Sequence, residues 1–156
     1  MQPIIITTID NTDDKIAEDI KAVQYAAYLQ EVRLLGAIWF PPLEKTVADI
    51  QRAPDRFFGA YIGNVLVGVA SMERSDSQSP AAISSMTVTP KYQRRGVARA
   101  LLATLLETEI HTVTVSTGAR NAPALALYAA FGFEIFKYRT VGEEQLELVE
   151  LKRDWS

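Results

Sequence analysis

The spacing of apolar and polar positions predicts short strands that alternate with helices. A β-branched run over residues 4–9 predicts a first strand, and the Asp10-Asn11 pair ends it. Apolar residues then recur at helical spacing over residues 14–35. This spacing predicts one long amphipathic helix, or two shorter ones, ending near Gly36.

Two hairpins give the clearest β-signals of the chain. Residues 56–62 and 65–73 are rich in β-formers and are joined by a two-residue Gly-Asn turn, which is typical of a tight hairpin. Residues 133–139 and 145–151 flank Gly142 and predict a second hairpin at the end of the chain. We therefore expect at least these strands to pair antiparallel.

The middle of the chain has the pattern of a strand, a loop, a helix and another strand. Residues 81–89 predict a strand that Pro90 stops, and Gly96 opens a helix over 97–109 whose apolar pairs recur every four residues. Residues 112–116 predict the next strand. Such a crossover joins parallel strands and is almost always right-handed.

Two short helices complete the pattern, one over residues 46–53 and one over 123–130. Early strands, a central crossover and a final hairpin together make a mixed α/β fold. The sequence has no internal repeat, low-complexity tract or interdomain linker, so we expect one domain over residues 1–156.

An apolar stretch over residues 37–43 is kept from forming a regular helix by two prolines. Its large side chains are Trp39, Phe40 and Leu43. A loop this apolar needs something to cover, so these residues are expected to line a substrate pocket or a lid over it. A dimer contact or a plug of the core would account for them equally well.

Bulk composition is that of an ordinary globular domain. The chain has 156 residues, of which 48% are hydrophobic and 22% charged, and a domain of this size buries roughly 70% of its unfolded surface. No apolar run reaches the ~20 residues of a membrane span, and the first residues lack the features of a signal peptide. We therefore expect a cytoplasmic protein that does not bind membranes.

Several kinds of chemistry are excluded by composition. The sequence has no cysteine, which removes disulfides, thiolate metal sites and cysteine nucleophiles. His111 is its single histidine, so a histidine-rich metal site is excluded, and we interpret His111 as structural or exposed. A net charge of −3 argues against a general nucleic-acid binder. We expect no metal and no nucleic acid.

The loop before the 97–109 helix has the character of a phosphate cradle. The first turn of a helix carries N–H groups without intrahelical partners and the positive end of the helix dipole. Gly96 has no Cβ and Ala98 is small, so a phosphate could approach the main chain closely. Arg94, Arg95 and Arg99 add positive charge around it, although they could also be a solvated surface.

Two motifs then resemble the GCN5-related N-acetyltransferase (GNAT) family. Its acyl-CoA signature Q/R-x-x-G-x-G/A is matched by Gln93-Arg94-Arg95-Gly96-Val97-Ala98. A second family element follows at the expected distance, formed by Asn121, Ala124, Leu127, Tyr128, Phe131, Gly132 and Phe133. A nucleotide binder of another family is disfavoured, because neither a Walker A motif nor a complete G-x-G-x-x-G is present.

The resemblance implies a GNAT-like single domain with a mixed, mostly antiparallel sheet of six to seven strands, a splayed parallel central pair and helices on both faces. It implies transfer of an acetyl group from acetyl-CoA to a primary amine of a small molecule or peptide, by direct attack through a tetrahedral intermediate. The partners would be acetyl-CoA and the amine, in a monomer or homodimer. The alternative is a catalytically inert acyl-CoA-binding or sensing domain.

The resemblance also assigns residues. Tyr128 would be the general acid that protonates the leaving thiolate, since a phenol of pKa about 10 stays protonated at neutral pH. A backbone N–H between Met86 and Val88, at a bulge in the strand, would hold the oxyanion, and we assign it to Val88. Each could also be a simple core residue. The cofactor-binding set is Met86, Thr87, Val88, Gln93, Arg94, Arg95, Gly96, Val97, Ala98, Arg99, Asn121 and Tyr128.

Asn121 and the general base have competing interpretations. Asn121 would bind the pantetheine amides, or would cap the helix that begins after it. No acid lies on the 81–89 strand, where Ser84 and Ser85 stand instead. We interpret Glu73 as the base, with Glu31, a chain of water molecules or a substrate that arrives as free amine as alternatives. The amine acceptor is not identified by the sequence.

Overall fold

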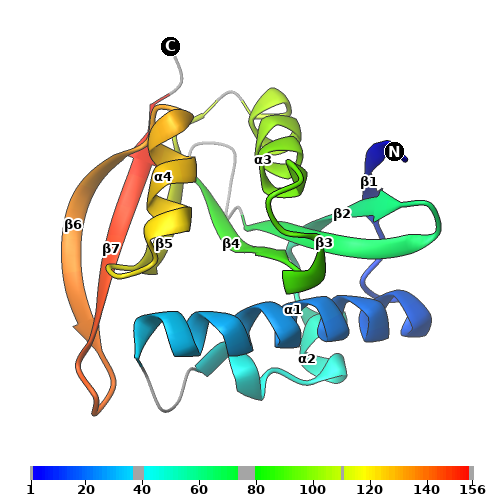
Figure 1. Ribbon diagram of the computed structural model, residues 1–156, viewed down its shortest axis with the longest axis horizontal. Coiled ribbons are helices and arrows are strands. Elements are labelled where there is room, and N and C mark those ends of the chain that lie inside the picture. The colour runs from blue at the N-terminus through cyan, green and yellow to red at the C-terminus, as the bar shows by residue number, and fades with distance from the viewer. Residues whose placement is uncertain (1, 37–40, 74–79, 110, 155–156) are drawn as a thin grey trace.

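A computed structural model describes residues 2–36, 41–73, 80–109 and 111–154. These residues form one seven-stranded sheet in the order β1-β2-β3-β4-β5-β7-β6 (Figure 1). The strands are β1 (Ile4–Ile9), β2 (Arg56–Ile62), β3 (Val65–Glu73), β4 (Ala81–Val88), β5 (Val113–Gly118), β6 (Glu134–Val141) and β7 (Leu146–Arg153). The α-helices are α1 (Asp14–Leu35), α2 (Val47–Arg52), α3 (Val97–Glu107) and α4 (Ala122–Ala130). The mixed α/β fold, the strand number and the mostly antiparallel pairing are confirmed.

Local sequence signals account for most element boundaries. α1 is one helix, begun by the Asp13 side chain accepting the Ile16 N–H and ended by Gly36 at φ 69°. The β2–β3 hairpin has the bounds that its pattern predicts. A short 3₁₀ turn forms at Pro41–Glu44, where we predicted an irregular loop. Proline fits the first turn of a helix because that turn needs no N–H donor.

Helices cover both faces of the sheet, as expected (Figure 1). α1 and α2 pack on one face, where Phe57 of β2 joins their core. α3 and α4 pack on the other face, which takes Phe58. Adjacent residues of a strand point to opposite faces, so this pair divides between the two cores. Gly68 permits the close approach of α3, because a Cβ there would lie 2.8 Å from Val97 Cγ1.

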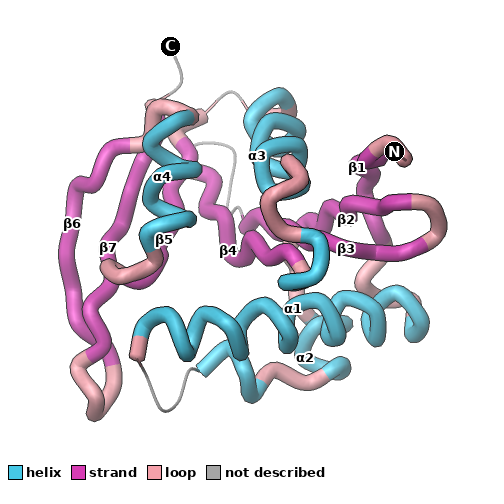
Figure 2. The backbone as a smooth tube through the Cα atoms, in the orientation of Figure 1, coloured by secondary structure: helices cyan, strands magenta, loops and turns pink. Residues whose placement is uncertain are grey.

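The parallel pair at the centre of the sheet separates soon after it forms (Figure 2). β4 and β5 pair only from Ala81 with Val113 to Ile83 with Val115. β5 continues to Gly118, beyond the predicted end at residue 116, because β7 supplies its ladder partners on the other edge. The expected splayed pair is therefore present.

A β-bulge lies in β4 just where that pairing ends. Ser71 of β3 stands opposite Ser85, and Met72 stands opposite Ile83, so Ser84 is an extra residue. The resemblance implied a bulge at the oxyanion donor, which we assigned to Val88; the bulge lies at Ser84, and the assignment of the donor to Val88 stays a prediction. A bulge depends on which residues of the partner strand stand opposite, and the β4 sequence alone does not specify them.

Three further expectations concern the end of α3, the apolar loop and membrane-spanning helices. α3 stops at Glu107 with Thr108 as its C-cap, two residues before the predicted end. Trp39 and Phe40 lie outside the described residues, whereas Leu43 lies in the Pro41–Glu44 turn; the predicted role of these three residues stays a prediction. No helix within the described ranges is both long and apolar enough to cross a membrane.

Candidate active site

A cleft of about 360 Å³ opens between β4 and β5. Its walls are β4 from residue 83 to 86 and β5 from residue 115 to 118, and α4 contributes Tyr128. The C-terminal half of α1 closes one side with Glu31, and Asn121 stands at the start of α4. The cleft therefore exists because β4 and β5 separate, and α4 and α1 form its remaining walls.

Backbone N–H groups of β4 point into the gap. Thr89 donates its N–H to the Val67 carbonyl of β3 at 2.9 Å. Because N–H directions alternate along a strand, those of Met86 and Val88 face β5, beyond the end of the β4–β5 ladder. Met86 lines the cleft. The Val88 carbonyl accepts a hydrogen bond from Gln93 Nε2 at 3.1 Å, so Val88 lies toward the basic loop.

Tyr128 is held rigidly at the cleft. It is 4% exposed, and its ring packs edge-on against Phe133 with centroids 5.4 Å apart. Burial raises the pKa of its phenol, and the nearby Glu31 and Tyr28 raise it further. The hydroxyl therefore stays protonated throughout the neutral pH range.

Asn121 connects α4 with α1. Its Oδ1 accepts the Ala124 N–H at 3.2 Å, which confirms the helix-capping interpretation. Its Nδ2 donates to Glu31 Oε1 at 3.3 Å. Both ends of the amide are therefore engaged within the protein. Binding of pantetheine by Asn121, which stays a prediction, would have to share these atoms.

Glu31 is a partly buried carboxylate in this cleft. Burial raises the pKa of its carboxyl group, and the Asn121 hydrogen bond opposes that rise. Its charge also contributes to the raised pKa of both Tyr28 and Tyr128. These three titratable groups therefore influence one another across the cleft.

The two serines of the β4 bulge form a hydroxyl network under α1. Ser71 Oγ lies 2.7 Å from Ser84 Oγ and 2.5 Å from Ser85 Oγ. Ser85 also accepts from Gln24 Nε2 at 3.3 Å and hydrogen-bonds the Tyr28 hydroxyl. Ser84 and Ser85, which stand where an acidic base was sought on this strand, thus hold the bulge in place. Ser85 also holds the Gln24 and Tyr28 side chains of α1.

Glu73, our sequence-based candidate for the base, lies elsewhere. It is the exposed last residue of β3, opposite Ala82 before the bulge, and it does not line the cleft. Glu31, which we ranked lower, does. Gln24, Tyr28 and Glu31 recur at helical spacing on α1, and these polar groups among the buried or partly buried positions of the helix are the signal that could have pointed to the cleft.

The predicted phosphate cradle has an open main chain. Gly96 begins α3 at φ 85° with no side-chain cap, and a Cβ there would meet nothing within 4 Å. Arg94 is also left-handed, at φ 64°, and loops with such residues can turn successive N–H groups toward an anion. Arg95 stacks on Tyr92 at 5.1 Å and Arg99 on Phe131 at 5.7 Å. These features fit a pyrophosphate group.

The remaining predicted cofactor residues support this loop. Thr87 is buried and donates its hydroxyl to the Val69 carbonyl at 3.2 Å. Gln93 bridges α1 and β4 through its amide, which also donates to Gln30 Oε1 at 2.7 Å. Val97 is buried and Ala98 partly buried at the start of α3. Their side chains therefore position the main chain of the cradle.

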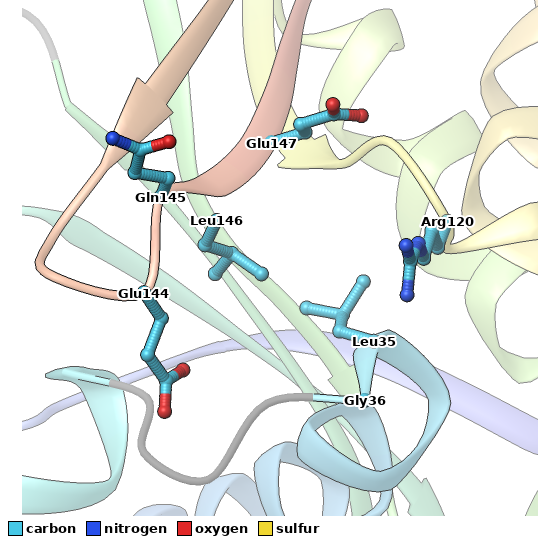
Figure 3. A pocket seen from close by; sticks show the side chains of 7 residues that line it. All are labelled: Leu35, Gly36, Arg120, Glu144, Gln145, Leu146 and Glu147. Atoms are coloured by element: carbon cyan, nitrogen blue, oxygen red, sulfur yellow. The ribbon is translucent and has the colours of Figure 1, made fainter.

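A second pocket of about 440 Å³ adjoins the cleft (Figure 3). Leu146 lines both spaces, and Arg120 is the residue before Asn121. In Figure 3, Leu146 lies between Glu144 and Glu147, and Leu35 lies beside Gly36 on the side toward Arg120. In the described part of the chain, no group of three or more acidic or histidine side chains is placed to hold a metal ion.

Comparison with known proteins agrees with this geometry. Residues 22–133 match the acetyltransferase (GNAT) family. N-alpha-acetyltransferase RimI of Mycobacterium tuberculosis is 35% identical over 71% of this chain and 72% of its own length. UPF0157 protein YqkA of Bacillus subtilis is 33% identical over 83% of this chain, which spans only 38% of that longer protein.

The fold has a solved counterpart bound to coenzyme A. PaiA N-acetyltransferase from Thermoplasma acidophilum, in complex with coenzyme A, superposes with a TM-score of 0.74 at 13% identity, over 95% of this chain and 98% of its own. At that identity the likeness supports the fold alone. The family match, the RimI relative and the fold agree: the chain belongs to the acetyltransferase (GNAT) family.

Proposed function

We propose that the protein transfers an acetyl group from acetyl-CoA to a primary amine of a small molecule or peptide. The observation that carries the proposal is the course of β4: its residues 83–86 line the cleft that Tyr128 borders, and its C-terminal end leads into the loop at Gly96, where α3 begins without a side-chain cap. This arrangement would offer an anion site, an oxyanion donor and a proton donor in the order that a thioester substrate would need.

The cradle would hold the pyrophosphate of acetyl-CoA. Gly96 leaves room for the phosphates, and Arg94, Arg95 and Arg99 supply charge. The splayed edge of β4 would receive the pantetheine arm, since its N–H groups there have no partner on β5. Acetyl-CoA would supply an activated acyl group, and the protein would supply position and proton transfer.

Two groups of this chain would act on the thioester. The N–H of Met86 or of Val88 would donate to the carbonyl oxygen as that oxygen gains charge after attack by the amine. Met86 is the better placed, because it lines the cleft. The Tyr128 hydroxyl would then protonate the departing thiolate.

The adjoining pocket would receive the acceptor. It meets the cleft at Leu146. Its mixed lining of Arg120, Glu144 and Glu147 suits a polar acceptor. RimI of M. tuberculosis is named for N-alpha-acetylation, so peptides with a free α-amino group belong among the first acceptors to test.

The test combines binding with turnover. Acetyl-CoA at about 100 times its Kd should stabilise the protein by ~2.7 kcal/mol, seen as a higher melting temperature. Release of coenzyme A should then be measured with a panel of spermidine, amino-acid amides, an aminoglycoside and an alanine-starting tripeptide. Stabilisation without turnover on any amine would favour the inert acyl-CoA-binding alternative. Absence of both would refute the proposal.

A further inference from the structure

The cleft contains a carboxylate that the proposed mechanism has not yet used. Glu31 is the one acidic side chain among the described residues that line it. It lies on α1, and Leu35, one helical turn further on, lines the adjoining pocket. Glu31 is therefore placed where the space for the thioester meets the space for the amine.

We propose that Glu31 is the catalytic base: it takes a proton from the acceptor's ammonium group and so frees the nitrogen lone pair for attack. This inference rests on the proposed acetyl transfer. In this proposal Glu31 takes the role of catalytic base that the sequence analysis gave to Glu73, which does not line the cleft.

A hydrogen bond restrains the Glu31 carboxylate. Asn121 Nδ2 donates to Oε1 at 3.3 Å, and the other end of the same amide caps α4. No further hydrogen-bond donor to Glu31 is recorded within the described ranges, so the second oxygen, Oε2, has capacity for the ammonium proton. Tyr128 stands on the same α4 helix that Asn121 begins. The proposed acid, Tyr128, thus lies on α4, and the proposed base, Glu31, is hydrogen-bonded to Asn121 at the start of the same helix.

The surroundings of Glu31 favour proton uptake. On its own helix it faces Tyr28, and on α4 it faces Tyr128. β6 contributes Arg139, whose Nε lies 4.0 Å from Glu150 Oε2. The lining residues of β4 and β5 carry no titratable side chain. Burial raises the pKa of the carboxyl group, which makes Glu31 a stronger base than a solvated glutamate.

The neighbouring pocket has charged groups of its own. Arg120, Glu144 and Glu147 line that pocket and not the cleft. Their charges would act on Glu31 electrostatically through space and not by direct contact. Within the cleft itself, an incoming ammonium group would therefore find its acidic counter-charge on Glu31.

The protons balance with these two groups. The ammonium nitrogen loses one proton to Glu31, which passes it to solvent, and the neutral amine then forms the C–N bond. The nitrogen loses its second proton as the C–S bond breaks, and the sulfur takes one from Tyr128. The proton from nitrogen restores Tyr128, so the products are amide, coenzyme A thiol and one released proton.

The experiment compares wild type with Glu31→Gln and with Glu18→Gln, an exposed control on the same helix. Glutamine keeps an oxygen that can accept from Asn121, so only the basicity is removed. The acceptor is the panel amine that the wild type uses fastest. We expect kcat of Glu31→Gln to fall by about 10² to 10⁴ at neutral pH, and the loss to shrink as pH passes the pKa of the amine. The Glu18→Gln variant should match wild type.

Each other outcome has a defined meaning. A loss of the same size at every pH would make Glu31 a support for Asn121, and a higher KM with unchanged kcat would make it an ammonium anchor; both overturn the proposal. Full activity of Glu31→Gln overturns it as well. If the wild type turns over no amine, the proposed function fails, and this inference fails with it.

A melting measurement tests the same residue without any acceptor. Because the folded-state pKa of Glu31 is raised, its ionised form disfavours folding, and this penalty appears as pH rises above the ordinary value of 4.5. Glu31→Gln should therefore melt higher than wild type near neutral pH, and the difference should vanish in acid. A lower melting temperature of the variant at both pH values would show that the carboxylate is structural and would overturn the proposal.

Discussion

Replacing Tyr128 with phenylalanine should separate chemistry from binding. The change deletes one hydroxyl and leaves the ring, which is 4% exposed and packs against Phe133 at 5.4 Å. A single hydroxyl contributes roughly 0.5 to 1.5 kcal/mol to stability at most, so the fold should persist. The shift in melting temperature caused by acetyl-CoA should persist as well.

The expected kinetic effect is much larger than the structural one. General acid catalysis contributes about 10² to 10⁴ in rate, which is roughly 2.7 to 5.5 kcal/mol of transition-state stabilisation. We therefore expect kcat of Tyr128→Phe to fall by that factor with KM for acetyl-CoA nearly unchanged. Since the pKa of Tyr128 lies above its ordinary value of 10.0, wild-type activity should show no loss from this group below that pH.

The assay is release of coenzyme A at saturating acceptor, with Tyr138→Phe as a matched control. Tyr138 lies on β6 and is 72% exposed, so its hydroxyl should not matter. A variant of full activity would mean that water protonates the thiolate and that Tyr128 is a core aromatic. Weaker acetyl-CoA binding with normal kcat would mean that the hydroxyl only binds the substrate.

Further predictions concern two glycines. Gly96→Glu places a negative side chain in the cradle and should abolish the ~2.7 kcal/mol acetyl-CoA stabilisation. A Cβ there meets nothing within 4 Å, so the cost to the fold should be limited to the strain of a side chain at φ 85°, about 1 to 2 kcal/mol. An unchanged melting shift would remove the cradle from the mechanism. Gly118→Ala would place a Cβ 2.3 Å from Leu35 Cδ2, so we expect about 1 to 3 kcal/mol of destabilisation in denaturant titration. That clash should also shift the end of α1 that carries Glu31 and lower kcat, and a variant as stable and active as wild type would contradict the packing of α1 on β5.

Features encoded by neighbouring residues could be predicted from the sequence. The β2–β3 hairpin follows from a Gly-Asn turn between two β-rich runs, and the α1 terminus follows from Gly36. The start of α3 at Gly96 follows from the glycine before a helical apolar pattern, and the use of this loop as a phosphate cradle stays a prediction. Each of these local features can be predicted without knowing which other parts of the chain pack against it.

Features created by distant contacts could not be predicted in the same way. Asn121 and Glu31 are 90 residues apart, and they meet only because α1 packs across the splayed strands. The position of the bulge depends on the pairing of Ser71 with Ser85. The position of β7 between β5 and β6 likewise depends on which strands pair, and the residue pattern within one strand does not determine that pairing.

The bulge has a consequence for how the cleft is encoded. A bulge bends its strand, and β4 bends away from β5 at Ser84, immediately after their last paired residues, Ile83 and Val115. Removal of that one residue should straighten β4 and allow the ladder to continue. The protein would gain hydrogen bonds between the two strands and lose the opening between them. In the proposed function, the opening for the pantetheine arm would thus depend on β4 being one residue longer than β3 requires, and the hydroxyl contacts of Ser84 and Ser85 hold that extra residue in place.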